Sequence, residues 1–269
     1  MSLILSLDRS LGDFDERRIT APVTSVRVNL SDQQGEVPVH RHRQGQLVLS
    51  LKGGVTCEVP SAVWMVPPRC AVWIPSQMPH SVRATANARI LYLFIQPDAA
   101  SMPAECCTLS ISPLVRELSL HLADQPRDYL PDNSTGRAAR VLLDQLMQMP
   151  VERLFLPISN EPRIRRIAHE LSSDPADRRT LEEWGDALAM SGRSLARLVS
   201  KETGLTFGRW RQQFHLIVAM RQLAEGRSVQ RVAEELGYES VTAFITMFKK
   251  AVGKPPGRYF AQLSRADES

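Results

Sequence analysis

The sequence lacks any apolar run of the ~18 residues that a membrane-spanning helix needs, so we expect no membrane insertion. Residues 1–10 contain one short apolar stretch with no basic segment ahead of it, which argues against a secretory signal. Only 4 of the 269 residues are cysteine, without the paired spacing of a zinc site or the density of a disulfide framework. We therefore expect reduced thiols and a cytoplasmic protein.

Excess charge of either sign is missing from the first part of the chain, where residues 1–150 carry 14 basic and 14 acidic side chains. Residues 191–258, by contrast, carry 12 basic and 5 acidic side chains. A positive field concentrated in one segment indicates a polyanionic partner for that segment. The length of 269 residues is enough for two domains, each with its own core.

Short β-rich runs, separated by Gly, Pro and Asn, fill the first hundred residues: 23–30, 46–51, 55–59, 71–74 and 89–95. This texture predicts a sandwich or small barrel, of which the jelly roll is one standard form. Beyond residue 112 apolar residues recur at three- and four-residue intervals, which predicts two helices with these positions on one face: Leu114, Leu118, Leu122, Ala139, Leu142, Leu143, Leu146 and Met147. These helices either pack on the barrel or form a two-fold dimer seam.

Two segments of the C-terminal half share the pattern of a helix-turn-helix. Such a unit needs a small residue in its first helix, a second small residue four positions on, and apolar residues facing inward from its second helix. The small residues are Gly185 and Ala189 in the first copy, and Ala233 and Gly237 come 48 residues later in the second. The expected inner faces are Leu195, Leu198 and Val199, then Phe244, Met247 and Phe248.

Helix-end signals frame these units. Thr180 and Glu183 form a capping box, Gly204 and Gly226 stand where helices stop, and Ser228 can cap a helix start. Residues 206–225 read as one connecting helix, whose ~20 residues span about 30 Å. That length is close to the ~34 Å between successive major-groove faces of B-DNA, so one chain is expected to place two recognition helices in adjacent grooves.

The stretches SGRSLARLVSKETGLTFGRWRQQF and VAEELGYESVTAFITMFKKAVGKPPGRYF resemble the signature of the AraC/XylS family of transcription regulators. The resemblance covers about 100 residues, and such a length makes an accidental match improbable. It implies a DNA-binding regulator of a nearby promoter, such as that of a transporter or efflux gene, that responds to a small-molecule effector. Promoter DNA is the implied partner, with RNA polymerase as a second partner for an activator.

The resemblance also assigns roles in the first recognition helix. Family members use the positions of Arg193 and Arg197 for base contacts, and arginine can clamp guanine O6 and N7. The alternative is that both arginines are solvated surface charge. Ser191, Ser194 and Lys201 are better suited to phosphate oxygens, which position a protein without specifying sequence.

The second recognition helix departs from the family pattern. Where many relatives carry arginine or other polar readers, this chain has Val241, Thr242 and Thr246, which favour thymine methyls or backbone. Ser240, Lys249 and Lys250 complete the expected DNA-contact set, the lysines on phosphates. We expect sequence choice to rest mainly on the first unit.

The stretch GEVPVHRHRQGQLVLSLKGG resembles the first cupin motif, with His40 and His42 in place and Gln46 where the motif has an acid. A second stretch, WIPSQMPHS, resembles the later cupin motif and offers His80. Three histidines can bind zinc or iron, but a glutamine supplies no charge to hold a dication. The alternative is a pocket with neutral histidines and no metal, either empty or lined by a ligand. Trp64 and Trp73 either line this pocket or belong to the core.

Together these features predict an α+β multidomain chain with a cupin or jelly-roll β-barrel, flanking helices and an all-α domain carrying two helix-turn-helix motifs. The expected limits are 1–105 for the barrel, 106–150 for the helical packing or dimerisation segment, 151–162 for the linker, and 163–264 for the DNA-binding domain, with motifs at 181–203 and 229–252. We expect a homodimer that is not an enzyme and requires no cofactor. The competing hypotheses are a metal-dependent cupin enzyme with an accessory DNA-binding domain and a nonspecific nucleic-acid binder.

Overall fold

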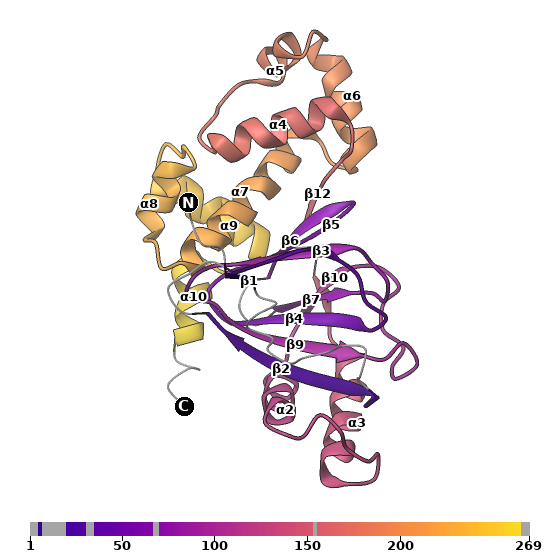
Figure 1. Ribbon diagram of the computed structural model, residues 1–269. Coiled ribbons are helices and arrows are strands. Elements are labelled where there is room, and N and C mark those ends of the chain that lie inside the picture. Colours follow the sequence, from indigo (N-terminus) through magenta and orange to yellow (C-terminus); the bar gives the residue numbers. More distant parts are fainter. Residues whose placement is uncertain (1–4, 7–19, 31–34, 67–69, 153–154, 265–269) are drawn as a thin grey trace. The chain divides into compact units, whose positions relative to one another are not determined.

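The computed structural model describes residues 5–6, 20–30, 35–66, 70–152 and 155–264 (Figure 1). It divides the chain into two compact units, one of Met1–Val59 with Trp64–Leu154 and one of Pro60–Val63 with Phe155–Ser269. The change from one unit to the other after Leu154 falls inside the segment 151–162 that the sequence marks as a linker. The predicted fold class, a β-rich domain followed by a helical one, is confirmed.

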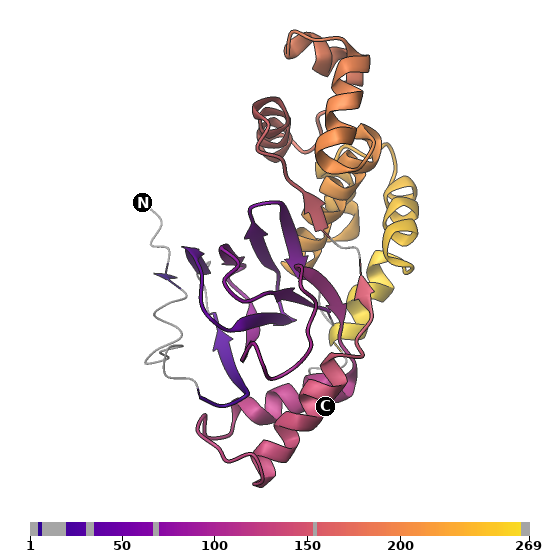
Figure 2. The ribbon, with the colours of Figure 1, turned by 90° about the vertical axis from the view of Figure 1, so that its right-hand side faces the viewer.

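Two sheets form the first unit. The first five strands of one sheet are, in order, β1 (Leu5–Ser6), β3 (Gly35–His40), β8 (His80–Ala84), β5 (Val55–Val59) and β6 (Ala62–Val66). The other runs in the order β11 (Val151–Glu152), β10 (Cys107–Ser110), β7 (Cys70–Ile74), β4 (Gly45–Lys52), β9 (Arg89–Ile95) and β2 (Val23–Asn29). The sheets curl in the manner of a jelly roll (Figure 2), and the described strands form two separate sheets rather than one closed barrel.

Strand alternation gives the second sheet two buried faces, because successive side chains of a strand point to opposite sides. On β9, Leu91, Leu93 and Ile95 join a core with helices α2 (Pro113–Ala123) and α3 (Ser134–Leu146). Trp73 belongs to the same core, and its indole N–H donates to the carbonyl of Pro103 at 2.7 Å. Of the two roles open to Trp73, the structure therefore supports the core.

The helical phase of α2 differs from the prediction. Its buried residues are Val115, Ser119 and Leu122, whereas Leu114 is 50% exposed. On α3 the predicted inner positions from Ala139 to Leu146 are buried, but Met147, just past the end of the helix, is 45% exposed. Of the positions predicted to share one face, Leu114 and Met147 therefore lie outside the stripe that meets the sheet.

The second unit begins with β12 (Phe155–Pro157), after which the N–H of Ile158 donates to the carbonyl of Ser61 at 2.9 Å. Helices follow: α4 (Pro162–Ser173), α5 (Leu181–Ala187), α6 (Gly192–Thr203), α7 (Phe207–Ala224), α8 (Val229–Glu235), α9 (Val241–Val252) and α10 (Pro256–Ser264). In the part of the chain that the structure describes, none of the helices has the length and apolarity required to traverse a bilayer.

The predicted helix ends are confirmed by hydrogen bonds. Thr180 and Glu183 make a reciprocal capping box at α5. The connector α7 has 18 residues between its caps Thr206 and Glu225, and therefore spans about 27 Å. Gly204 ends α6 in the left-handed conformation with φ of +71°, which a residue without Cβ adopts at no steric cost.

The internal repeat is visible in the two turns. Ala189 and Gly237 both have positive φ, +54° and +71°. The residue after each donates its N–H to the residue five positions back, from Met190 to Gly185 and from Tyr238 to Ala233, both at 2.9 Å. The first copy is the tighter one, since a Cβ on Gly185 would lie 2.7 Å from the carbonyl oxygen of Met190.

Candidate DNA-binding and effector sites

The outward face of α6 carries the two arginines predicted to read bases. Leu195 and Val199 are fully buried toward α5, whereas Arg193 and Arg197 are exposed one helical turn apart. Because the inner and outer residues of α6 are fixed by that packing, both guanidinium groups project from the same side of the helix. This side of α6 is therefore exposed and can contact a molecule that binds the helical domain.

Ser191 has a structural role beside the predicted phosphate contact. Its hydroxyl oxygen accepts the N–H of Ser194 at 3.2 Å and its proton goes to the Ser194 hydroxyl at 2.9 Å. Capping in this way sets the N-terminus of α6, where the positive end of the helix dipole favours an anion. Lys201 is exposed in the last turn of α6.

The outward face of α9 is smaller and less polar. Phe244 and Phe248 are fully buried, as predicted. Thr242 and Thr246 are exposed, and the Thr246 hydroxyl donates to the Thr242 carbonyl at 2.8 Å. Since that proton is engaged within the helix, Thr246 presents an acceptor oxygen and a methyl group. Val241 is half-buried beside them.

The ends of α9 hold its remaining predicted contacts. Ser240 caps the helix by accepting the N–H of Ala243 at 3.1 Å, and Lys249 and Lys250 are exposed in the last turn. Ala243 is exposed on the same side as Thr246. The sequence reasoning overlooked Ala243, although its position three residues before Thr246 marks a shared face.

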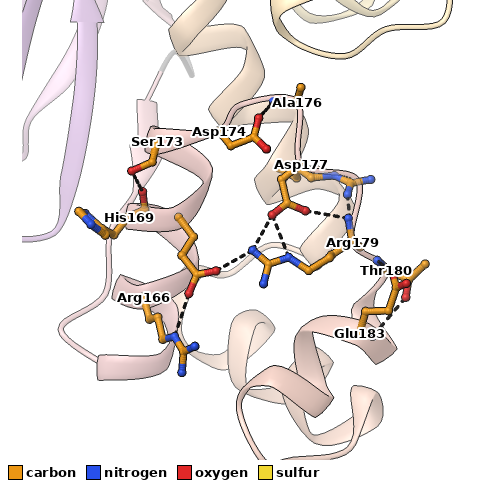
Figure 3. A network of polar contacts seen from close by, with 11 residues as sticks. Arg166, His169, Ser173, Asp174, Ala176, Asp177, Arg179, Thr180 and Glu183 are labelled. Atoms are coloured by element: carbon orange, nitrogen blue, oxygen red, sulfur yellow. Dashed lines mark hydrogen bonds and ion pairs between the residues drawn. The ribbon is translucent and has the colours of Figure 1, made fainter.

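A polar network lies at the start of the first helix-turn-helix motif (Figure 3). The Arg179 guanidinium donates to Asp177 at 2.8 Å through Nε and to Glu170 at 2.6 Å, and it stacks 3.5 Å over the buried Trp184 ring. These hydrogen bonds from Arg179 hold the pKa of both carboxyl groups below their ordinary values. Because Arg179 directly precedes Thr180, the network fixes where α5 begins.

In the first unit of the chain, His40, His42 and His80 converge as the cupin-like motifs predict. One ring nitrogen from each lies within 4.8 Å of the others. The backbone brings them together because His40 on β3 pairs directly with His80 on β8. His42 and His80 are buried and His40 is half-buried.

Backbone carbonyls fix the tautomer of all three rings. Nδ1 of His40, His42 and His80 lies 2.9, 2.7 and 2.9 Å from the carbonyl oxygens of Pro38, Gln44 and Met78. A carbonyl oxygen only accepts, so each Nδ1 carries the proton and a neutral ring keeps its lone pair on Nε2. This outer hydrogen bond is the arrangement that orients histidines as metal ligands.

Gln46 bridges two of the histidines. Its Oε1 lies 2.9 Å from Nε2 of His42 and 2.8 Å from Nε2 of His80. Burial, followed by the neighbouring His40 and His42, lowers the pKa of His80 to about 4, so His80 is neutral near pH 7. The Gln46 oxygen and an unprotonated Nε2 are both acceptors and cannot form a hydrogen bond with each other. Either the Gln46 side chain is rotated so that its NH₂ donates to the Nε2 atoms, or its oxygen faces a cation that the Nε2 atoms bind.

The sequence reasoning missed one aromatic residue next to this cluster and a second one that neighbours the first. Phe94 on β9 lies 5.5 Å from the His42 ring and 6.4 Å from Tyr92, centroid to centroid. Tyr92 is buried, burial raises the pKa of its hydroxyl, and that hydroxyl has no hydrogen-bond partner among the described residues. Alternation along the predicted strand 89–95 was the available signal. Trp64 is buried on β6 and remains a predicted lining residue.

These features define a DNA-binding transcription regulator with a sensor domain. A helix-turn-helix domain model matches residues 184–262, and an AraC-like ligand binding domain model matches residues 23–155. The chain is 52% identical over 227 residues to the HTH-type transcriptional regulator NimR of Escherichia coli, covering 84% of this chain and 83% of that protein. The chain belongs to the AraC family of transcription regulators.

Two further comparisons found weaker similarities. A putative AraC-like transcription regulator of Streptomyces lividans is 26% identical over 246 residues, covering 89% of this chain and 71% of that protein. A crystal structure of ToxT from Vibrio cholerae aligns with a TM-score of 0.37 at 10% identity, covering 88% of this chain and 96% of that chain. The family implies DNA and a small-molecule effector as partners.

Proposed function

We propose that one chain reads a two-part operator, with α6 in one major groove and α9 in the next. The carrying observation is the joint exposure of Arg193 and Arg197 above the buried inner face of α6. Arginine can donate two hydrogen bonds to guanine, so α6 supplies most of the discrimination. Val241, Thr242 and Thr246 of α9 contact thymine methyls or backbone. Phosphate contacts come from Ser191, Ser194, Lys201, Ser240, Lys249 and Lys250.

Selection of bound sequences from a random DNA pool tests this function. The wild-type chain is expected to enrich a two-part motif in which guanine is the most constrained base. Arg197→Ala should relax one position of the motif, and Arg165→Ala, an exposed arginine of α4, is the control for lost charge. Enrichment of no motif would instead support the nonspecific nucleic-acid binder.

The effector site of this proposal is the cluster of His40, His42, Gln46 and His80, with Trp64 as a further lining residue. The buried, neutral His80 ring and the buried Tyr92 hydroxyl, which has no hydrogen-bond partner among the described residues, suit a small ligand with both ring and polar character. Binding there affects the operator only through different affinities for two states of the protein. Operator affinity measured for wild type and His80→Ala across a library of small molecules tests this assignment.

A divalent metal ion is a second candidate for the same cluster, favoured by the convergence of one ring nitrogen from each of the three histidines within 4.8 Å. The donor set of three imidazoles fits zinc, and Gln46 would supply an oxygen without charge. Cobalt absorption and metal content after loading test this candidate. His42→Ala should abolish binding and Gln46→Glu should tighten it; an equal metal content in both variants would contradict the site.

The alternative that the chain is a metal-dependent enzyme also requires metal at the histidine cluster. Metal binding alone would not establish it, because an enzyme must also turn over a substrate. Its support is the histidine trio alone, and the position of the cupin acid is taken by Gln46. Turnover of a substrate by the metal-loaded chain would favour the enzyme. We propose that the chain acts instead as a regulator in the cytoplasm and that, if it activates, it recruits RNA polymerase.

Dimerisation is part of the proposal and rests on α2 and α3. Leu114, Val141 and Met147 are between 45% and 50% exposed, and exposed apolar residues that form one contiguous patch mark an interaction site. A second copy is the proposed occupant, since a two-fold axis lets one face cover itself. Sedimentation equilibrium should show a dimer for wild type and a monomer for Val141→Glu; a dimer for both would contradict this interface.

A further inference from the structure

The loop between α4 and α5 contacts the second helix-turn-helix unit directly. The Arg178 guanidinium donates to the carbonyl of Gly237, 59 residues away, and forms an ion pair with Glu239 at 3.3 Å. Ala176 lies so close to Gly237 that a Cβ on this glycine would be 3.1 Å from it. We call these four residues, Ala176, Arg178, Gly237 and Glu239, the clasp. The clasp therefore links the loop that precedes the first helix-turn-helix motif to the turn of the second motif.

Both sides of the clasp also contact the connector α7. Arg211 of α7 donates to the carbonyl of Arg179 at 3.3 Å, on the loop side. His215 of α7 lies within 3.3 Å of the Tyr238 hydroxyl, on the side of the second turn. The loop, α7 and the turn before α9 therefore meet at one junction. Displacement of the clasp would move the start of α5 relative to the start of α9.

The junction rests on a small number of contacts. A cavity of about 450 Å³ adjoins it, lined by clasp residues together with Gly208, Gln212 and Ala243. Arg178 and Glu239 are 58% and 86% exposed, so their ion pair alone adds little stability. A guanidinium donating to a backbone carbonyl is directional, however. The contact is thus suited to holding an angle and contributes little to the stability of the fold.

We propose that the clasp fixes the angle between the two helix-turn-helix units and thereby the operator spacing that one chain accepts, with Arg178 as a positioning residue. This inference rests on the proposed use of α6 and α9 on one duplex. Each added base pair moves the second half-site by about 3.4 Å and rotates it by about 34°. A junction held at one angle tolerates such a shift poorly, whereas a loosened junction accommodates it.

The test measures affinity against spacing. The two half-sites enriched by selection are rebuilt with one or two base pairs inserted or removed between them, and binding of full-length wild type and Arg178→Ala is titrated at one salt concentration. Wild type should lose at least about tenfold in affinity at one base pair from the optimum, or ~1.4 kcal/mol. The Arg178→Ala chain should lose less than threefold. Arg178→Lys, which keeps a donor and the charge, should restore part of the dependence.

Two controls separate positioning from other roles. Arg165→Ala removes an exposed arginine of α4 outside the clasp and should keep the wild-type spacing profile. Affinity for each isolated half-site should be the same in wild type and Arg178→Ala. A spacing profile in Arg178→Ala that matches wild type would overturn the proposal, as would weakened binding to isolated half-sites, which would make Arg178 a direct DNA contact. If selection yields no two-part motif, the proposed function fails before the clasp is tested.

Discussion

The two helix-turn-helix units share a scaffold and differ in what they present. Both second helices begin at a capping serine, Ser191 and Ser240, both end at a left-handed glycine, and both bury two apolar residues toward the first helix. Outside that scaffold, α6 exposes two arginines whereas α9 exposes threonines and alanine. Capping and packing therefore position α6 and α9 in the same way. The specificity of each helix depends on the few residues that it exposes.

The largest expected effect is at the small residue of the first helix. Gly185→Ala places a Cβ 2.7 Å from a backbone carbonyl and should lower the free energy of unfolding by about 3 kcal/mol. Ala233 occupies the matching position of the second unit with a Cβ already present. Ala233→Gly should cost only about 1 kcal/mol, the helix-interior penalty of glycine. Urea denaturation compares them, and equal losses would mean that the two turns are packed alike.

The next effect separates the reading faces. Arg197→Ala should weaken specific binding by ~1 to 3 kcal/mol and relax one base position. Thr246→Ala, the matched change on α9, should cost less than about 1 kcal/mol because it removes a methyl group and a neutral acceptor oxygen but no charged two-donor contact. Fluorescence anisotropy on the selected operator measures both. A larger loss for Thr246→Ala would reverse the assigned ranking of the two units.

The dependence of stability on pH provides a third contrast between the two motifs. Among the described residues, only the turn of the second motif has a histidine beside it, His215 next to Tyr238. Burial lowers the pKa of His215 from 6.5 to about 4, so between these values the unfolded chain binds more protons than the folded one. Stability is then fully present above pH 6.5 and falls as the pH drops toward 4. Thermal unfolding should show this fall, and His215→Gln should show a shallower one. An identical pH profile in both would exclude His215 as its source.

The smallest expected effect concerns the lysines that end the recognition helices. Lys201→Ala on α6 and Lys249→Ala on α9 should each weaken binding equally on all sequences and reduce the salt slope of log K by about 1. This is where the units should behave alike, because phosphate contacts carry no sequence information. A change in base preference in either variant would show that the lysine contacts a base.

Features set by neighbouring residues were predictable from the sequence. The Thr180 capping box, the Gly204 helix end and the two small-residue pairs all follow from residues within one or two turns of each other. The histidine trio was found through its spacing and its resemblance to cupin motifs. Such signals act over short stretches of chain, so a single sequence carries them.

Features that depend on contacts between distant segments were not predictable. The exposure of Leu114 depends on which stripe of α2 meets the sheet, and nothing in its three- and four-residue spacing distinguishes it from Leu122. The hydrogen bond from Arg178 to Gly237 joins residues that no local pattern relates. The place of Phe94 beside His42 follows from strand pairing, which fixes partners only once the sheet is assembled.

Hydroxyl-radical footprinting of the selected operator tests most directly whether one chain engages two successive grooves. The chain used is the Val141→Glu variant, which is expected to be monomeric, and native mass spectrometry first verifies that its complex contains one chain per duplex. The account predicts two protected windows on one face of the DNA, centred about 10 base pairs apart, with the Arg197 half more strongly protected. A single protected window from one bound chain would contradict it.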